Sequence, residues 1–309
     1  MPAVRLPLAA RWIMRFAVCL SLVLSLSFAE PGFSGPVQAD ARPGAWLRDV
    51  KVGYRAGGKD CFGLVNIYFP KSYVPGSGVR TLIVLHGYSQ KPGDWESGTP
   101  IAAYADRYNF VLVCPAMTTT LYESKYFPET ENRWAPVPGG EYIASILLPF
   151  VRKHYGLAAD RSRTGIFGVS TGGRGALLLA AQHADLFGAA TGLSGDYDSA
   201  TMKRDRILLS VYGSYDLNPE RWEDEVNVLK LAVNLKKTPV FLGHGTNDPI
   251  VPPPQTQMLV DRLEGLRKAK GGYECVVDRE KSRNAGHDWR YWGSLVPDVL
   301  KFFDRTLAK

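Results

Sequence analysis

Short runs of apolar residues alternate with amphipathic stretches along most of the chain. The first two runs, Leu47–Tyr54 and Phe62–Phe69, flank turn-forming residues at 55–58, which predicts an antiparallel strand pair. From Arg80 onward the runs are shorter and continuously apolar, as is typical of strands that are buried on both faces. These runs occupy 80–86, 110–114, 165–169, 189–193, 239–243 and 273–277.

Helical patterns lie between these strand-like runs, at 141–154, 171–184, 254–268 and about 290–307. Pro149 falls inside the first of them and predicts a kink there. The alternation of strand and helix predicts an α/β fold with a mostly parallel central sheet flanked by helices on both faces. A single domain over about 41–309 is the simplest organisation.

Two regions interrupt this alternation. Residues of about 118–140 are rich in aromatic residues and proline, and about 199–237 contain short amphipathic pieces. We expect both to be insertions above the edge of the sheet that carries the functional site, because loops there commonly form binding sites.

The N-terminus has the pattern of an export signal. Three arginines within the first fifteen residues precede the apolar run Phe16–Phe28, and small residues follow. This order predicts a secretory leader over 1–29, with cleavage after Ala29 or as late as Ala39, and a secreted or periplasmic protein. An uncleaved anchor is the alternative, although no run reaches 18 apolar residues.

Composition limits the class of protein. Hydrophobic residues make up 45% of the 309 residues and charged residues 22%, which is ordinary for a globular protein. The formal charge of +7 falls to +4 without residues 1–29, and the basic residues are dispersed. We therefore expect no nucleic-acid partner. Oligomeric state is left open.

Cysteines offer no metal motif. Cys19 lies in the expected leader, which leaves Cys61, Cys114 and Cys275 at spacings that match no zinc site. They permit either one disulfide with one thiol or three thiols. We favour three thiols, because cysteine in apolar strand-like runs behaves as a small hydrophobic residue.

The strongest chemical signal is Gly168-Val169-Ser170-Thr171-Gly172. A strand-like run precedes it and a helical pattern of small residues follows. This setting is the nucleophile elbow, which exposes a serine on a tight turn between strand and helix. Ser170 is the predicted nucleophile; a glycine-rich turn without chemistry is the alternative.

The base and the acid follow from their order along the chain. In this fold class the acid and then the histidine come after the serine. His287 lies in a loop after the last strand-like run, and Asp248 follows the run at 239–243. We predict His287 as the base and Asp248 as the acid. Asp216 is the second candidate acid, and His244 is interpreted as structural.

Acyl transfer also requires donors for the developing oxyanion. The backbone N–H groups of Thr171, just after the nucleophile, and Tyr88, in the loop after the run at 80–86, are the predicted donors. His86 is expected to hold that loop rather than to react. No metal or organic cofactor is implied.

Five segments together resemble the esterase D (putative esterase) family of α/β-hydrolases. They are LIVLHGYS (82–89), RSRTGIFGVSTGGRG (161–175), LFGAATGLSG (186–195), GTNDPIV (245–251) and GHDWRYW (286–292). The family includes feruloyl esterases, S-formylglutathione hydrolases and mycolyl transferases. The resemblance implies a Ser170, Asp248, His287 triad with Tyr88 and Thr171 as oxyanion donors. Thr171 departs from the methionine of many members, but only its backbone is required.

These observations predict an exported serine esterase that acts on a small-molecule or polysaccharide ester, with feruloyl or acetyl groups as candidates. An acyltransferase with the same triad is the first alternative, and an inactive binding protein on the same fold is the second. Trp134 is the candidate substrate-binding residue, with Tyr122 and Tyr126 beside it in sequence, because aromatic rings stack on sugars and phenols. Packing within the insertion is the other interpretation of these three rings.

Overall fold

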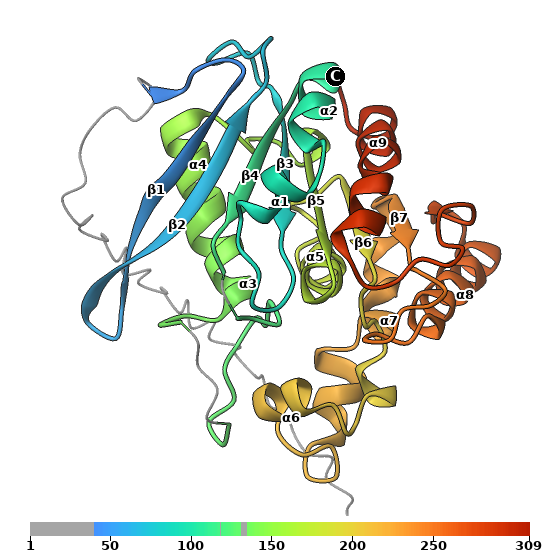
Figure 1. Ribbon diagram of the computed structural model, residues 1–309. Helices are drawn as coiled ribbons and strands as arrows, with labels where there is room; N and C mark the ends of the chain where they lie inside the picture. Colours follow the sequence, from blue (N-terminus) through green and yellow to red (C-terminus); the bar gives the residue numbers. More distant parts are fainter. Residues whose placement is uncertain (1–39, 118, 131–134) are drawn as a thin grey trace, which may run out of the picture. The chain divides into compact units, whose positions relative to one another are not determined.

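A computed structural model describes residues 40–117, 119–130 and 135–309, which belong to one compact unit, Pro31–Lys309. The expected leader and Trp134 lie outside the described residues. An eight-stranded sheet runs through the unit in the order β1-β2-β4-β3-β5-β6-β7-β8 (Figure 1). The fold is therefore the predicted α/β-hydrolase fold.

Strand pairing agrees with the hydrophobic pattern. β1 (Ala45–Ala56) and β2 (Lys59–Phe69) form an antiparallel pair, β2 is antiparallel to β4, and all later pairs are parallel. The remaining strands are β3 (Arg80–Leu85), β4 (Phe110–Pro115), β5 (Thr164–Val169), β6 (Ala189–Leu193), β7 (Val240–Gly243) and β8 (Cys275–Val277). Every residue of β3 to β7 is buried, as expected for strands covered on both faces.

Helices cover the two faces of the sheet unequally. α1 (Asp94–Gly98), α2 (Ile101–Tyr108) and α9 (Trp289–Thr306) share one hydrophobic core with the sheet, and Figure 1 shows α9 beside α2. The other face packs on a second core formed with α4 (Leu148–Tyr155), α5 (Thr171–Gln182), α7 (Val228–Leu231) and α8 (Pro254–Lys270). The short helices α1 and α2 were not predicted.

The helix expected to kink at Pro149 changes its geometry before the proline. α3 (Gly139–Glu141) continues into a π-helical segment, Tyr142–Leu147, and α4 then begins with Pro149 in its first turn. Proline has no N–H to donate to the preceding turn, and wider π-helical turns are a common response. The kink at Pro149 stays a prediction, and the change observed is one of helix type just before the proline.

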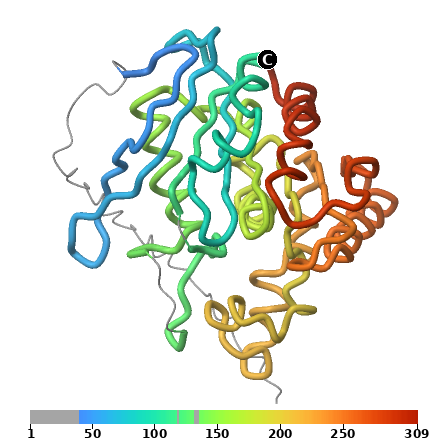
Figure 2. The backbone as a smooth tube through the Cα atoms, viewed as in Figure 1, coloured from blue at the N-terminus to red at the C-terminus, as the bar shows by residue number. Residues whose placement is uncertain are grey.

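The two insertions pack against each other. The second contains α6 (Arg206–Tyr212) and a π-helical turn, Arg221–Glu225. Apolar side chains from both insertions form a small separate core: Leu121, Phe127, Leu208, Val211, Tyr212, Trp222 and Val226. The backbone view in Figure 2 shows both insertions on the side of the sheet where its parallel strands end.

The three described cysteines are free thiols on three different strands. Cys114 is fully buried in β4, and burial raises the pKa of its thiol. Burial likewise raises the pKa of Cys275 to about 12. Both thiols are therefore protonated at neutral pH and behave as small apolar side chains. Among the described residues, no helix is both long and apolar enough to cross a membrane.

Candidate active site

Ser170 lies on a strained turn between β5 and α5. Its backbone has φ 56° and ψ −126°, a conformation that is uncommon for a residue with a side chain. The flanking glycines make the turn possible. A Cβ on Gly168 would lie 2.5 Å from the Gly172 backbone, and one on Gly172 would lie 2.5 Å from the carbonyl oxygen of His86. The turn therefore has the strand–turn–helix geometry expected of a nucleophile elbow.

The structure brings Ser170, His287 and Asp248 into one hydrogen-bonded chain. His287 Nε2 lies 2.9 Å from Ser170 Oγ, and His287 Nδ1 lies 2.7 Å from Asp248 Oδ2. A carboxylate only accepts, so Nδ1 carries the proton and Nε2 is left to accept from the serine hydroxyl. Such a chain can activate a serine hydroxyl for attack on a carbonyl carbon.

The loops after β7 and β8 hold the acid and the histidine together. Asn247 N donates to Ala285 O at 3.0 Å, and Thr246 N donates to Ser282 O at 2.8 Å. Gly245 permits this contact, since a Cβ there would lie 2.3 Å from Ala285 O. Asp248 and His287 are thus fixed relative to each other by backbone bonds rather than by their side chains alone.

Asp248 is held in its charged form. Burial by itself would raise the pKa of its carboxyl group, but hydrogen bonds from His244 and His287, and from the backbone N–H groups of Val251 and Ile250, lower the pKa well below its usual range. The two backbone donors lie 2.9 and 2.8 Å from Oδ1. The carboxylate therefore stays ionised at neutral pH.

His244 is a second histidine on the same carboxylate. Its Nε2 lies 3.3 Å from Asp248 Oδ2 and 3.0 Å from Val251 O, and its Nδ1 lies 2.8 Å from Thr256 Oγ1. Two acceptors face Nε2, so this nitrogen carries a proton. His244 was expected to be structural. The structure adds a direct contact with Asp248, for which the i, i+4 spacing was the available signal.

The loop after β3 borders the nucleophile. A Cβ on Gly87 would lie 3.1 Å from Ser170 Cβ, so Tyr88 follows a residue that touches the serine. His86 holds the loop: its Nε2 accepts from Met117 N at 3.0 Å and its Nδ1 donates to Gly87 O at 2.7 Å. Burial lowers the pKa of His86, which favours this neutral form.

Trp292 of α9 packs against one side of the His287 imidazole. Its ring meets that of His287 edge to face, with centroids 5.0 Å apart, and its Nε1 donates to Ser194 Oγ at 3.1 Å. Trp289 continues the aromatic contact, 5.3 Å from Trp292. The imidazole therefore has a rigid wall on one side.

Three other residues considered in the sequence analysis are not part of the hydrogen-bonded chain of Ser170, His287 and Asp248. Asp216 is exposed in the loop after α6, and the structure gives it no contact with His287. Tyr122 is fully buried, with its hydroxyl donating to His86 O at 2.7 Å, so the interpretation of this ring as packing is correct and substrate stacking is wrong. Tyr126 donates to Ala135 O at 2.8 Å within its own insertion.

One buried charge pair close to Ser170 was not predicted. Arg174, one helical turn after Ser170, is fully buried and faces Asp196, with Nε and Oδ2 3.4 Å apart. Its other nitrogens donate to Leu121 O at 3.1 Å and to Val226 O at 2.7 Å, one carbonyl in each insertion. Asp196 follows β6 closely, and an acid after a parallel strand was the available signal.

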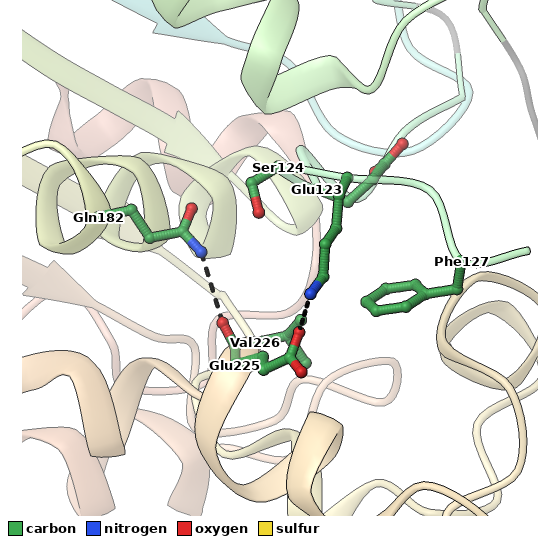
Figure 3. A pocket seen from close by; sticks show the side chains of 7 residues that line it. Glu123, Ser124, Phe127, Gln182, Glu225 and Val226 are labelled. Carbon is green, nitrogen blue, oxygen red and sulfur yellow. Dashed lines mark hydrogen bonds and ion pairs between the residues drawn. The ribbon is translucent and has the colours of Figure 1, made fainter. Parts of the chain in front are cut away.

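A surface hollow of about 290 Å³ lies where the two insertions meet the end of α5. Figure 3 shows Gln182 of α5 reaching Glu225 from one side, with Glu123 and Phe127 on the other. Lys125 bridges the hollow to Glu225, with Nζ and Oε2 2.5 Å apart. Gln182 is the last residue of α5 and lies about 18 Å along the helix from Ser170, and neither Ser170 nor His287 lines the hollow.

Within the described part of the chain, no group of three or more His, Cys, Asp or Glu side chains is placed to hold a metal ion. The groups that converge on Ser170 are donors, acceptors and an imidazole. This set suits acyl transfer from an ester to a serine oxygen.

The fold and the elbow define an α/β-hydrolase. The family model described as "Putative esterase" matches residues 61–303, so the chain belongs to that family of carboxylic ester hydrolases.

Similar proteins with stated activities include an acetyl esterase of Caldicellulosiruptor saccharolyticus, 24% identical over 75% of this chain and 86% of that protein. A diacylglycerol acyltransferase/mycolyltransferase, Ag85A of Mycobacterium gordonae, is 24% identical over 91% of this chain and 84% of its own. The solved structure of the fluorophosphonate-binding serine hydrolase FphF of Staphylococcus aureus superposes with a TM-score of 0.65 at 18% identity, covering 85% of this chain and 99% of that one.

Proposed function

We propose that the protein is an exported serine esterase in which Ser170, His287 and Asp248 form the catalytic triad. The observation that carries the proposal is the hydrogen-bonded chain from Ser170 Oγ through His287 to Asp248, with distances of 2.9 and 2.7 Å. In this proposal Ser170 Oγ attacks the ester carbonyl carbon while His287 Nε2 takes the hydroxyl proton. Asp248 orients the imidazole and stabilises its charged form.

The tetrahedral intermediate would be held by the backbone N–H groups of Tyr88 and Thr171. Support comes from Gly87, which lies against Ser170, and from the position of Thr171 as the first residue of α5. Collapse of the intermediate breaks the bond to the alcohol, which leaves with the proton from His287. Water then attacks the acyl-enzyme by the same route and releases the acid.

For the substrate, we propose an ester with a small or aromatic acyl group, such as an acetylated or feruloylated polysaccharide. The acetyl esterase among the similar proteins supports the acetyl case. Wild-type protein should hydrolyse at least one acetyl or feruloyl ester, and a fluorophosphonate probe should label Ser170. Absence of both labelling and hydrolysis in folded protein would refute the esterase proposal.

An acyltransferase is the second candidate, because one similar protein carries that name and spans most of the chain. The two reactions share the acyl-enzyme and differ in whether water or an alcohol attacks it. Product analysis with a sugar acceptor present separates them: transfer requires an esterified acceptor, and hydrolysis gives only free acid.

Export is proposed from the basic head and the apolar run of residues 1–29. N-terminal sequencing of protein from its native host should find Glu30 or Asp40 first. Soluble protein that retains Met1 would contradict the proposed leader.

A further inference from the structure

Asp196 is a buried carboxylate beside the proposed site that the triad does not use. It lies in the loop after β6, the strand next to the one that carries Ser170. Its neighbour Gly195 is pressed against the first turn of α5, since a Cβ there would lie 2.8 Å from Arg174 N. Ser194, at the start of the same loop, binds Trp292, whose ring contacts His287. The loop therefore borders the imidazole.

The polar atoms of this cluster are incompletely satisfied. Asp196 Oδ2 and Arg174 Nε face each other 3.4 Å apart as an ion pair, and neither of these two atoms makes a hydrogen bond to any described residue. Leaving such groups without partners is costly in a buried site. The arrangement is suited to an additional polar group.

The charges indicate what kind of group fits. Arg174 balances the charge of Asp196, so a cationic ligand is not required. A hydroxyl group fits, because it can donate a hydrogen bond to a carboxylate. Arg174 and Tyr212 are fully buried, whereas 7% of the Asp196 side chain is exposed, so a ligand would meet Asp196 first.

The position also indicates which part of an ester would reach this residue. The departing alcohol takes its proton from the histidine and must therefore lie on the His287 side of the site. Burial raises the pKa of the Asp196 carboxyl group, and the charges of Arg174 and, more weakly, of His287 oppose this shift.

We propose that Asp196 is a specificity-determining residue that accepts a hydrogen bond from a hydroxyl group on the alcohol part of the ester. The substrates favoured would be esters of polyhydroxylated alcohols rather than of simple alcohols. This inference rests on the proposed esterase function.

The test compares acetates that differ by one hydroxyl: 2-hydroxyethyl against ethyl acetate, and 3-hydroxypropyl against propyl acetate. In at least one pair, wild-type kcat/KM should favour the hydroxylated ester by about 10- to 100-fold, the range for one hydrogen bond to a charged group. The ratio should fall to about one in Asp196→Ala and at least severalfold in Asp196→Asn.

Asp198→Asn is the matched control. Asp198 lies two residues further along the loop and has its own partners, Asn227 Nδ2 at 2.7 Å and Ala200 N at 3.2 Å, so the ratio should stay at the wild-type value. Melting temperature and fluorophosphonate labelling report whether each variant is folded. If Asp196→Ala does not fold, the ratio in Asp196→Asn decides.

Two results would overturn the inference: ratios near one in both wild-type pairs, or a wild-type ratio that persists in folded Asp196 variants. In the second case the carboxylate only neutralises Arg174. Hydrolysis of the simple acetates without discrimination defeats this inference and leaves the esterase proposal intact, whereas wild-type protein with neither hydrolysis nor labelling defeats both.

Discussion

Replacing His244 with leucine should weaken the proposed catalysis without abolishing it. His244 Nε2 donates to Asp248 Oδ2 over 3.3 Å and shares its proton with Val251 O at 3.0 Å. Three closer donors remain on the carboxylate, at 2.7, 2.8 and 2.9 Å. A hydrogen bond to a charged group contributes about 1.5–3 kcal/mol, and a long shared bond belongs at the lower end. We therefore expect kcat to fall about tenfold.

The stability of the variant should depend on pH in a defined direction. The donors hold the pKa of Asp248 below its usual range in the folded state. A carboxyl group of this kind stabilises the fold above its unfolded pKa, and that contribution is lost as pH falls through the folded pKa. Removing the His244 donor reduces this stabilising contribution. The difference in unfolding free energy between wild type and His244→Leu should therefore be largest near pH 7 and should shrink below pH 4.

The assay is kcat on an activated acetyl ester between pH 5 and 9, with urea unfolding measured on the same samples. Thr256→Val is the matched control, because it removes the partner of His244 Nδ1 at 2.8 Å and leaves the contact with Asp248 in place. Its kcat should fall less than that of the leucine variant. A wild-type kcat in His244→Leu would show that the hydrogen bond from His244 does not contribute to catalysis. A loss approaching 10⁴-fold would show that His244 is as important as the acid itself.

Three further predictions use the same assays. Ser170→Ala should lose several orders of magnitude in kcat and all fluorophosphonate labelling while remaining folded; turnover near wild type would remove it as the nucleophile. Asp248→Asn should lower kcat by about 10⁴-fold and the exposed Asp216→Asn hardly at all; the reverse result would make Asp216 the acid. Burial raises the pKa of Asp196 from 3.8 to about 6, so the folded state binds more protons than the unfolded state between these values. The unfolding free energy of wild type, relative to Asp196→Asn, should fall by roughly 2 kcal/mol from pH 4 to pH 7; a flat difference in urea unfolding would refute this assignment.

The sheet could be predicted from the sequence because its signal is local. Each parallel strand is a continuous apolar run, and all of them appear in the structure within a few residues of the expected bounds. The elbow was equally readable, since glycines on both sides of Ser170 are required by backbone contacts under 3 Å. The short helix α2 was missed, because eight residues carry too little periodicity to stand out.

The residues of the candidate site could be predicted where their order along the chain was sufficient to select them. Order along the chain selected His287 and Asp248, and the structure places both in one hydrogen-bonded chain with Ser170. The pairing of Arg174 with Asp196 could not be predicted from the sequence in this way. It depends on β6 lying next to β5 and on two insertions that supply carbonyl oxygens. Partners of a buried charge are set by tertiary packing and cannot be read from spacing alone.

The guanidinium of Arg174 also limits how this enzyme can be remodelled. It donates to one carbonyl of each insertion, at Leu121 and Val226, and the Lys125–Glu225 bridge joins the same two segments at the surface. A loop graft that replaces only one insertion would leave a fully buried arginine with a donor and no acceptor, at a cost of about 1–3 kcal/mol or more. Transplants between relatives should therefore succeed when both insertions and the residue at position 174 are exchanged as one cassette.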